Sequence, residues 1–173
     1  MKHNVFMLGA IFIFLSGCEI SSKNLISMDE IVKLISHFYE NSHISILGET
    51  DIDLNTKLIF LEVDKQRGFS VFEQDNLKSS ALNNYLFDST KPFSGQLVPY
   101  NQPDEFLYIV YSDGSELTKV QLTINNDKIQ TKEVILNEPS LTIFNLNLPP
   151  GTTHFTLDRV YYGIIGEEIQ FND

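Results

Sequence analysis

The stretch FLYIVYSDGSELTKVQLTINNDKIQTKEVIL, residues 106–136, is the clearest indication of the fold. It contains three runs of strand-forming residues, at 106–111, 117–124 and 128–136, separated by turn residues at 112–115 and 125–127. Further runs of the same kind lie at 141–148, 153–162 and 167–171. Short strands at this spacing, with turn residues between them, are typical of antiparallel β-sandwiches. The sequence therefore predicts a mainly β protein whose sandwich spans about residues 92–173.

The first of these runs is apolar on both of its faces. Leu107, Ile109 and Tyr111 alternate with Phe106, Tyr108 and Val110. Successive side chains of a strand point to opposite sides, so a continuous apolar run indicates a strand that is covered on both sides. We expect this strand to be central, with one face on the core. We expect the other face to be covered by an N-terminal helix or by a hairpin at 57–72.

The chain before residue 106 gives weaker signals. Residues 57–63 and 68–72 are rich in β-formers and are separated by residues 64–67, which predicts a β-hairpin. Residues 76–87 are ambiguous, and our expectation there is a short helix. We expect loop in the stretch that follows, because it is punctuated by Pro92, Pro99 and Pro103.

A helix is predicted over residues 27–40. Ser27 is the expected N-cap, and Glu30 three residues later completes a capping box. Ile26 before the cap can pack on Ile31. One apolar stripe, which we expect to dock on a sheet, is formed by Ile31, Leu34, Ile35 and Phe38. Residues 26–173 are then a single globular domain, with a division near residue 92 as the alternative.

The C-terminal half resembles fibronectin type III and other immunoglobulin-like domains. Residues 148–153 (LPPGTT) imitate their corner before the tyrosine-bearing strand, and residues 163–166 imitate their last turn. Phe155 stands where those domains have the corner tyrosine, and the chain has no tryptophan. Residues 58–88 also resemble the first hairpin and following segment of the lipoprotein of type VI secretion membrane complexes, itself a β-sandwich.

The N-terminus has the three parts of a secretory signal. Lys2 supplies a positive charge, residues 5–15 are an apolar core, and small residues lead into Cys18. The core is too short for a membrane-spanning helix, which needs about 20 apolar residues. Residues 15–18 (LSGC) match the lipobox of bacterial lipoproteins. This resemblance implies removal of residues 1–17, lipidation of Cys18, and a tether at 18–25.

Charge and the residue after Cys18 bear on partners and location. The chain has 12 basic and 23 acidic residues; loss of Lys2 with the signal leaves 11 against 23, a net charge of −12. This balance argues against nucleic acid and against adhesion to anionic lipid. Gram-negative lipoproteins retained in the inner membrane carry Asp after the lipidated cysteine, whereas this chain has Glu19. We therefore expect an outer-membrane anchor facing the periplasm, with display on the cell surface as the alternative.

One stretch has the ligand spacing of a calcium-binding loop. Oxygen-bearing side chains lie at positions one, three, five and twelve, namely Asp51, Asp53, Asn55 and Glu62. Thr56 occupies the position where such loops have glycine, and residues 58–63 are typical of a strand. We therefore interpret this stretch as a polar turn that leads into a strand, with calcium binding as the alternative.

The histidines do not form a recognisable catalytic or metal site. His37 and His43, with Glu40 between them, lack the four-residue spacing of a helical zinc pair. His154 has no serine-hydrolase motif with it, and Cys18 has its own covalent role. No cofactor, metal or catalytic residue is indicated.

Two functions remain open. The first is a non-catalytic accessory or binding lipoprotein for an envelope protein, for example in a secretion complex or as an immunity protein against a toxin. The second is a small envelope hydrolase or metal-dependent enzyme that uses Asp51, Asp53 or His154.

Overall fold

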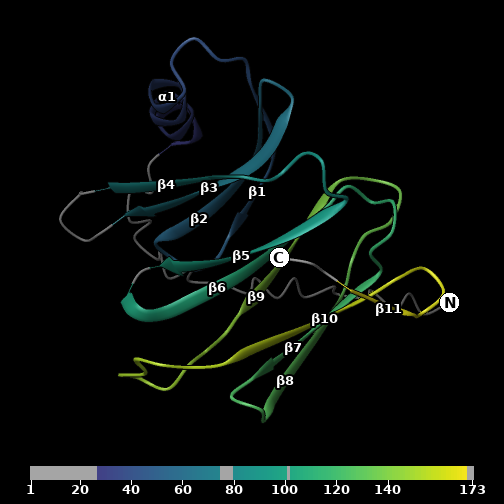
Figure 1. Ribbon diagram of the computed structural model, residues 1–173. Helices are drawn as coiled ribbons and strands as arrows, with labels where there is room; N and C mark the ends of the chain where they lie inside the picture. Colours follow the sequence, from purple (N-terminus) through teal and green to yellow (C-terminus); the bar gives the residue numbers. More distant parts are fainter. Residues whose placement is uncertain (1–26, 75–79, 101, 171–173) are drawn as a thin grey trace, which may run out of the picture.

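A computed structural model of the protein describes residues 27–74, 80–100 and 102–170. Within these residues, one helix, α1 (Met28–Phe38), precedes eleven strands in three antiparallel sheets (Figure 1). The first sheet consists, in spatial order, of β1 (Ile44–Asp51), β2 (Thr56–Val63), β3 (Gln66–Gln74) and β4 (Ser80–Leu86). The second consists of β5 (Phe93–Tyr100), β6 (Gln102–Ser112) and β9 (Ser140–Asn145). The third consists of β11 (Glu168–Ile169), β10 (Leu157–Tyr162), β7 (Lys119–Ile124) and β8 (Lys128–Glu133). The predicted mainly β, antiparallel, sandwich-like fold with one N-terminal helix is confirmed.

The strand β6 lies at the centre of the molecule. It is the middle strand of the second sheet, between β5 and β9. One of its faces, with Leu107, Ile109 and Tyr111, packs in a cluster that includes Leu58, Phe69 and Val71 of the first sheet. Its other face, with Tyr108 and Val110, packs in a cluster with residues of β7 and β10. The prediction of a central strand covered on both faces is confirmed, and the cover is the β2–β3 hairpin.

The helix covers the opposite face of the first sheet. A separate cluster joins Ile31 and Ile35 of α1 to Ile59, Leu61 and Val63 of β2. The molecule is therefore a stack of helix, first sheet, second sheet and third sheet, which Figure 1 shows from top to bottom.

The start of α1 is as predicted, but its apolar stripe is not. The Ser27 side chain accepts the Glu30 N–H while the Glu30 carboxylate accepts the Ser27 N–H, so the capping box is present. The packing of Ile26 on Ile31 falls outside the described residues. The prediction that Leu34 and Phe38 are core residues is wrong, since their side chains are 39% and 62% exposed. Each residue of a helix is rotated by about 100° from the last, and the contact with the sheet is centred on Ile31 and Ile35.

The hairpin β2–β3 forms where the sequence predicts it. Its turn is made by Asp64 and Lys65, both with positive φ, the conformation that matches the twist of a two-residue hairpin. The expectation of a short helix at 76–87 is wrong for its described part, because β4 pairs with β3 from Gly68↔Leu86 to Gln74↔Ser80. Pairing with the edge of a sheet outweighs the weak helical preference of these residues.

The expectation of loop in the stretch punctuated by Pro92, Pro99 and Pro103 is also wrong where β5 and the start of β6 lie. β5 forms a hairpin with β6 despite Pro99. β5 is an edge strand, where a residue without an N–H is tolerated, and the register shifts between Pro99 and Tyr100.

The later strands are shorter than predicted, although their order and turns agree. β7 begins at Lys119, β8 ends at Glu133, β9 ends at Asn145 and β10 begins at Leu157. Pairing sets these limits, because the β10–β7 register ends at Leu157↔Ile124, where Asn125 and Asn126 turn the chain with positive φ.

The two flanks between the second and third sheets differ. On one flank, β8 side chains donate hydrogen bonds to main-chain oxygens of β9 and the residue after it: Lys132 to Ile143, Gln130 to Asn145 and Lys128 to Leu146. On the other flank, β5 belongs to the second sheet and β10 to the third, and the two strands do not pair with each other. There the Tyr108 and Tyr161 hydroxyls, 2.6 Å apart, join the two sheets beneath Gly95. A Cβ at Gly95 would lie 2.0 Å from the Tyr108 oxygen, so only glycine leaves room for this contact.

Candidate functional site

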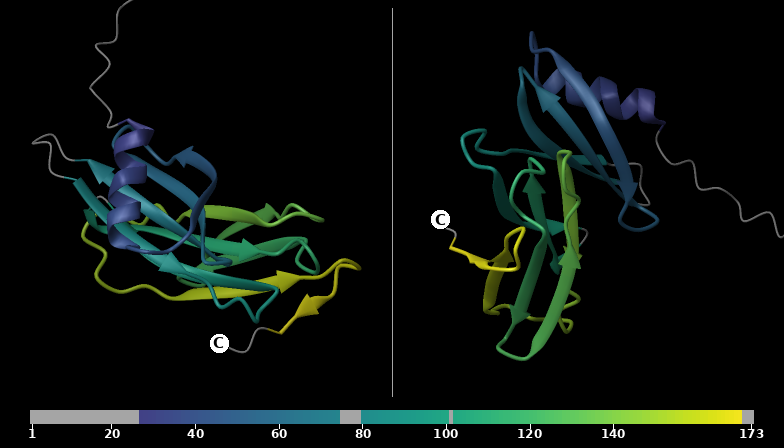
Figure 2. Two further views of the ribbon diagram at one scale, coloured as in Figure 1. Left: turned by 90° about the horizontal axis from the view of Figure 1, so that it is seen from above. Right: turned by 90° about the vertical axis from the view of Figure 1, so that its right-hand side faces the viewer.

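The hairpin formed by β10 and β11 projects from one end of the molecule. We call residues 157–169 the distal hairpin. Figure 1 shows its turn at the right-hand end and α1 at the opposite, upper left. Figure 2 shows the same separation in two further views. The distal hairpin and α1 therefore lie at opposite ends of the described part of the molecule.

Local hydrogen bonds fix the turn of the distal hairpin. The Gly163 N–H donates to the Glu167 oxygen at 2.8 Å, and the Gly166 N–H donates to the Gly163 oxygen at 3.0 Å. The Glu167 carboxylate folds back and accepts the Ile165 N–H at 3.0 Å. Gly166 has a φ of +82°, which residues with a side chain avoid. The conformation of this turn is therefore specified by its own residues.

The base of the distal hairpin is fixed to the start of β7. The Thr118 N–H donates to the Tyr162 oxygen at 2.9 Å. The Thr118 hydroxyl lies within hydrogen-bonding distance of the Tyr162 and Gly163 oxygens, at 3.0 and 2.8 Å. The Lys119 ammonium lies 4.0 Å from the centroid of the Tyr162 ring, a cation–π contact. The turn is thus held at a fixed position relative to the sandwich.

Two isoleucines occupy the exposed tip of this turn. Ile164 is 62% exposed and Ile165 is 88% exposed. Exposed turns favour Gly, Pro, Asn, Asp and Ser, so adjacent β-branched apolar residues are unusual there. Burying one such side chain contributes about 1.5–3 kcal/mol. A partner that covered the pair would gain much of this free energy without having to order the turn.

Acidic residues surround the tip. A shallow hollow of about 490 Å³ beside it is lined by Glu116, Ile164, Glu167, Glu168, Ile169 and Gln170. Residues 160–173 contain no lysine or arginine. The tip is therefore an apolar contact within a negatively charged surrounding.

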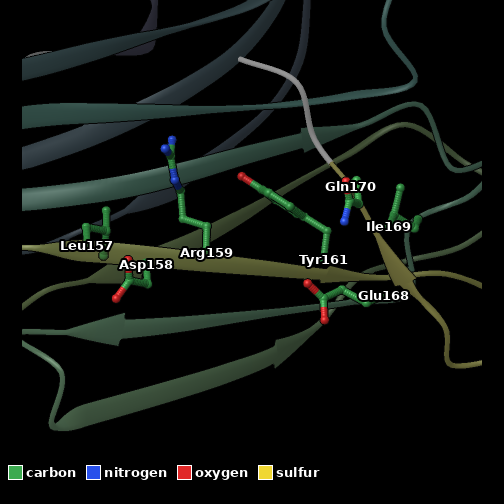
Figure 3. A pocket seen from close by; sticks show the side chains of 7 residues that line it. All are labelled: Leu157, Asp158, Arg159, Tyr161, Glu168, Ile169 and Gln170. Atoms are coloured by element: carbon green, nitrogen blue, oxygen red, sulfur yellow. The ribbon is translucent and has the colours of Figure 1, made fainter.

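A second hollow lies along β10 and β11, the two strands of the distal hairpin (Figure 3). Its volume is about 330 Å³, and it is lined by Leu157, Asp158, Arg159, Tyr161, Glu168, Ile169 and Gln170. Figure 3 shows the Arg159 and Tyr161 side chains on one side of β10 and the Asp158 and Glu168 carboxylates on the other. The Arg159 guanidinium lies 5.9 Å from the centroid of the Tyr108 ring. The exposed Arg159 thus lies over Tyr108, one of the two joined tyrosines, and the Asp158 and Glu168 carboxylates also line the hollow.

The four residues with calcium-loop spacing are not brought together. Asp51, Asp53 and Asn55 line one small cavity at the β1–β2 turn. Glu62 lies five residues beyond Lys57, the partner of Asp51 across the two strands, which is roughly 16 Å along β2. There Glu62 accepts a hydrogen bond from Arg67 at 2.9 Å.

The carboxylates at this turn have protein partners. The Lys57 ammonium lies 2.9 Å from Asp51 and 3.5 Å from Glu49, and the hydrogen bond to Asp51 is the main reason that its pKa is raised. Asp53 accepts the Asn55 N–H at 2.7 Å. Among the described residues, no group of three or more His, Cys, Asp or Glu side chains is arranged to hold a metal ion. The interpretation of a polar turn leading into a strand describes this stretch.

The three histidines of the described residues, His37, His43 and His154, are exposed. His37 is 3.4 Å from Glu40 at the end of α1, while the main-chain N–H of His43 donates to Asp64. His154 precedes β10, in a connecting segment instead of the strand that we predicted. Phe155 beside it packs on Phe106, with ring centroids 5.3 Å apart. Cys18 lies outside the described residues.

Comparisons with protein-family models, with curated proteins and with solved structures find no significant match to this chain. In the described part of the chain, no helix is both long and apolar enough to span a membrane.

The candidate site was missed by our reasoning from the sequence. We interpreted residues 163–166 only as the last turn of an immunoglobulin-like domain. The available signal was the pair Ile164 and Ile165 between two glycines, where a turn normally has polar residues. Its exposure could not be derived, since it depends on the absence of a packed neighbour at that end of the sandwich.

Proposed function

We propose that this protein is a lipid-anchored envelope protein that binds a protein partner through the tip of its distal hairpin and has no catalytic role. The lipobox residues at 15–18 support the anchor. The observation that carries the binding role is the pair of exposed isoleucines on a turn fixed by its own hydrogen bonds.

The chemistry of the tip specifies the kind of partner. An apolar pair within an acidic surrounding fits a partner that has an apolar pocket bordered by lysine or arginine. Opposite charges on two proteins accelerate their encounter and exclude partners of the wrong sign, while the apolar contact supplies affinity. An immunity lipoprotein that blocks a basic toxin has this chemistry.

The proposed location is the outer membrane with the domain facing the periplasm, because Glu19 follows the lipidated cysteine in place of Asp. Labelling with a fatty-acid analogue tests the anchor directly. Cys18→Ser should abolish the label and release the protein from membranes washed with carbonate. A variant that stays bound after the wash would contradict the anchor.

Site-specific crosslinking tests the binding role. A photoreactive phenylalanine analogue at position 165 of the full-length lipoprotein, in its native membranes, should form an adduct with one protein. The matched control is position 129 in β8, where Ile129 is 62% exposed, and it should form none.

Charge provides the second part of this test. The Glu168 side chain is exposed and makes none of the hydrogen bonds that fix the turn, so Glu168→Lys should reduce the adduct at 165 without unfolding the protein. Equal labelling at 165 and 129, or an adduct that does not change with Glu168→Lys, would count against a basic partner at the tip.

A further inference from the structure

We propose that the outer face of α1 lies on the lipid surface beside the anchor, so that the domain stands on the membrane with the distal hairpin pointing away from it. We call Lys33, Leu34, His37 and Phe38 the outer face of α1. This inference rests on the proposed lipid anchor at Cys18 and adds a second, non-covalent contact with the membrane.

The outer face of α1 has apolar side chains that the fold leaves uncovered. Leu34 and Phe38 are four residues apart, so they form one row along the helix. They are 39% and 62% exposed, whereas Ile31 and Ile35 in the row beside them are 1% and 0% exposed. The Phe38 ring packs edge to face on the ring of its neighbour Tyr39, with the ring centroids 5.0 Å apart. The helix is thus apolar on the side of the sheet and partly apolar on the side of the solvent.

The length of the tether places α1 near the lipid. Ser27 caps the helix nine residues after Cys18, and nine residues span at most about 30 Å when fully extended. The helix itself is about 16 Å long. No other described element follows the anchor so closely in the chain, and the distal hairpin lies at the opposite end (Figures 1 and 2). The uncovered apolar row therefore belongs to the element that the anchor holds nearest to the membrane.

The charges of the outer face also fit a lipid surface. Lys33 and His37 flank the apolar row in a chain that is otherwise strongly acidic. Asp29 and Glu30 lie four residues before Lys33 and Leu34, on the same side of the helix but in its first turn, where Glu30 completes the cap. Residues 33–38, which hold the apolar row, contain no acidic residue, and Glu40 pairs with His37 beyond the end of the helix. A helix with apolar residues and a cation on one side can lie in the headgroup region. The acidic tip at the other end of the molecule is unsuited to a membrane.

Tryptophan fluorescence tests this orientation, because the chain has no tryptophan of its own. Single variants Phe38→Trp and Ile165→Trp of the lipidated protein are placed in phosphatidylcholine vesicles, with and without bromine on the acyl chains. Both positions are exposed, so both variants should fold. We expect brominated lipid to reduce the emission of the Phe38→Trp variant by roughly half, since interfacial helices insert about 5–10 Å into the boundary region. The emission of the Ile165→Trp variant should not change.

The outcomes separate this inference from the proposed anchor. A protein that does not float with the vesicles contradicts the anchor, and the inference fails with it. Flotation without quenching at position 38 overturns the inference alone, as does quenching at position 165. Protection of the indole at position 38 from iodide in the absence of vesicles, increasing with protein concentration, would assign the face to a second copy and also overturn it. Leu34→Glu added to Phe38→Trp should restore most of the lost emission.

Discussion

The strand β6 and the turn of the distal hairpin contain the same kinds of residue in opposite environments. Ile109 of β6 is completely buried, with a strand at each edge and a sheet on each face. Ile164 and Ile165 are 62% and 88% exposed, and their turn is held mainly by its own hydrogen bonds. Apolar residues buried inside the fold thus contribute to its stability, whereas those on a rigid and exposed turn are available for binding. Substitutions in the two kinds of region should therefore differ in what they damage.

The largest expected effect is at the centre of β6. Ile109→Ala should reduce the free energy of unfolding by about 2–5 kcal/mol, because it leaves a cavity between two packed sheets. Urea unfolding followed by circular dichroism measures this change. The matched control is Ile129→Ala in β8, which should stay within about 0.5 kcal/mol. Similar losses at 109 and 129 would show that burial does not distinguish the two positions.

The helix provides the same contrast within one turn. Ile35→Ala should cost about 2–5 kcal/mol, because Ile35 is fully buried against the first sheet. Phe38→Ala should cost much less, since 62% of its side chain is already in water. Thermal melting of both variants measures the difference. A larger loss at Phe38 than at Ile35 would mean that the helix docks through its other row.

A smaller effect is expected at the helix N-terminus, and it depends on pH. Ser27→Ala should destabilise the protein by about 1 kcal/mol at neutral pH. The hydrogen bond from the Ser27 N–H to the Glu30 carboxylate, with help from the Ser27 hydroxyl, lowers the pKa of Glu30 below its usual 4.5. A lowered pKa in the folded state stabilises the protein above that pH and ceases to do so as the pH falls through the folded value.

Melting temperatures measured from pH 7 down to pH 3 check this cap. Ser27→Ala keeps the main-chain N–H that bonds to the Glu30 carboxylate and loses only the hydroxyl. The difference in melting temperature between the wild type and Ser27→Ala should therefore narrow, by the hydroxyl's share alone, as the pH falls through the folded pKa of Glu30. Thr90 lowers the pKa of Asp88 in the same way, and this contribution stays in both variants as an internal reference. A gap that widens in acid would contradict the assignment of the cap.

The smallest effect on stability is expected at the tip. Ile165→Ser should change the free energy of unfolding by no more than about 0.5 kcal/mol, because the side chain has few neighbours to lose. With the crosslinker moved to position 164, the same substitution should still reduce the adduct. A loss of unfolding free energy as large as that of Ile109→Ala would show that the Ile165 side chain contributes to the stability of the fold.

The strands that could be predicted are those whose sequence alone specifies burial. β6 is apolar on both faces, so its central place followed from its residues. The β2–β3 hairpin was also predicted, and its turn at Asp64 and Lys65 lies within the predicted segment 64–67. The strands β4 and β5 were missed because their partners decide their conformation: β4 completes a sheet edge, and Pro99 is tolerated only since β5 is an edge strand. Leu34 and Phe38 of α1 were wrongly predicted as core residues, because the apolar residues of the helix extend beyond the face that contacts the sheet.

The functional residues were harder to predict for a related reason. The spacing of Asp51 and Glu62 fits a loop, yet most of the chain between them is an extended strand, which places the two carboxylates far apart. Spacing in the sequence becomes distance in space only when the local conformation is known. The exposure of Ile164 and Ile165 depends on which surfaces the rest of the fold leaves uncovered.

The side-chain hydrogen bonds from β8 to β9 affect how neighbouring copies of this protein can associate. Lys128, Gln130 and Lys132 occupy main-chain oxygens that an incoming strand would otherwise use. On the proposed lipid anchor the protein would diffuse in two dimensions and collide sideways, so an accessible sheet edge would join neighbouring copies into chains. An incoming strand at β9 must first displace two ammonium groups and an amide, which protects neighbouring copies from coalescing along this edge.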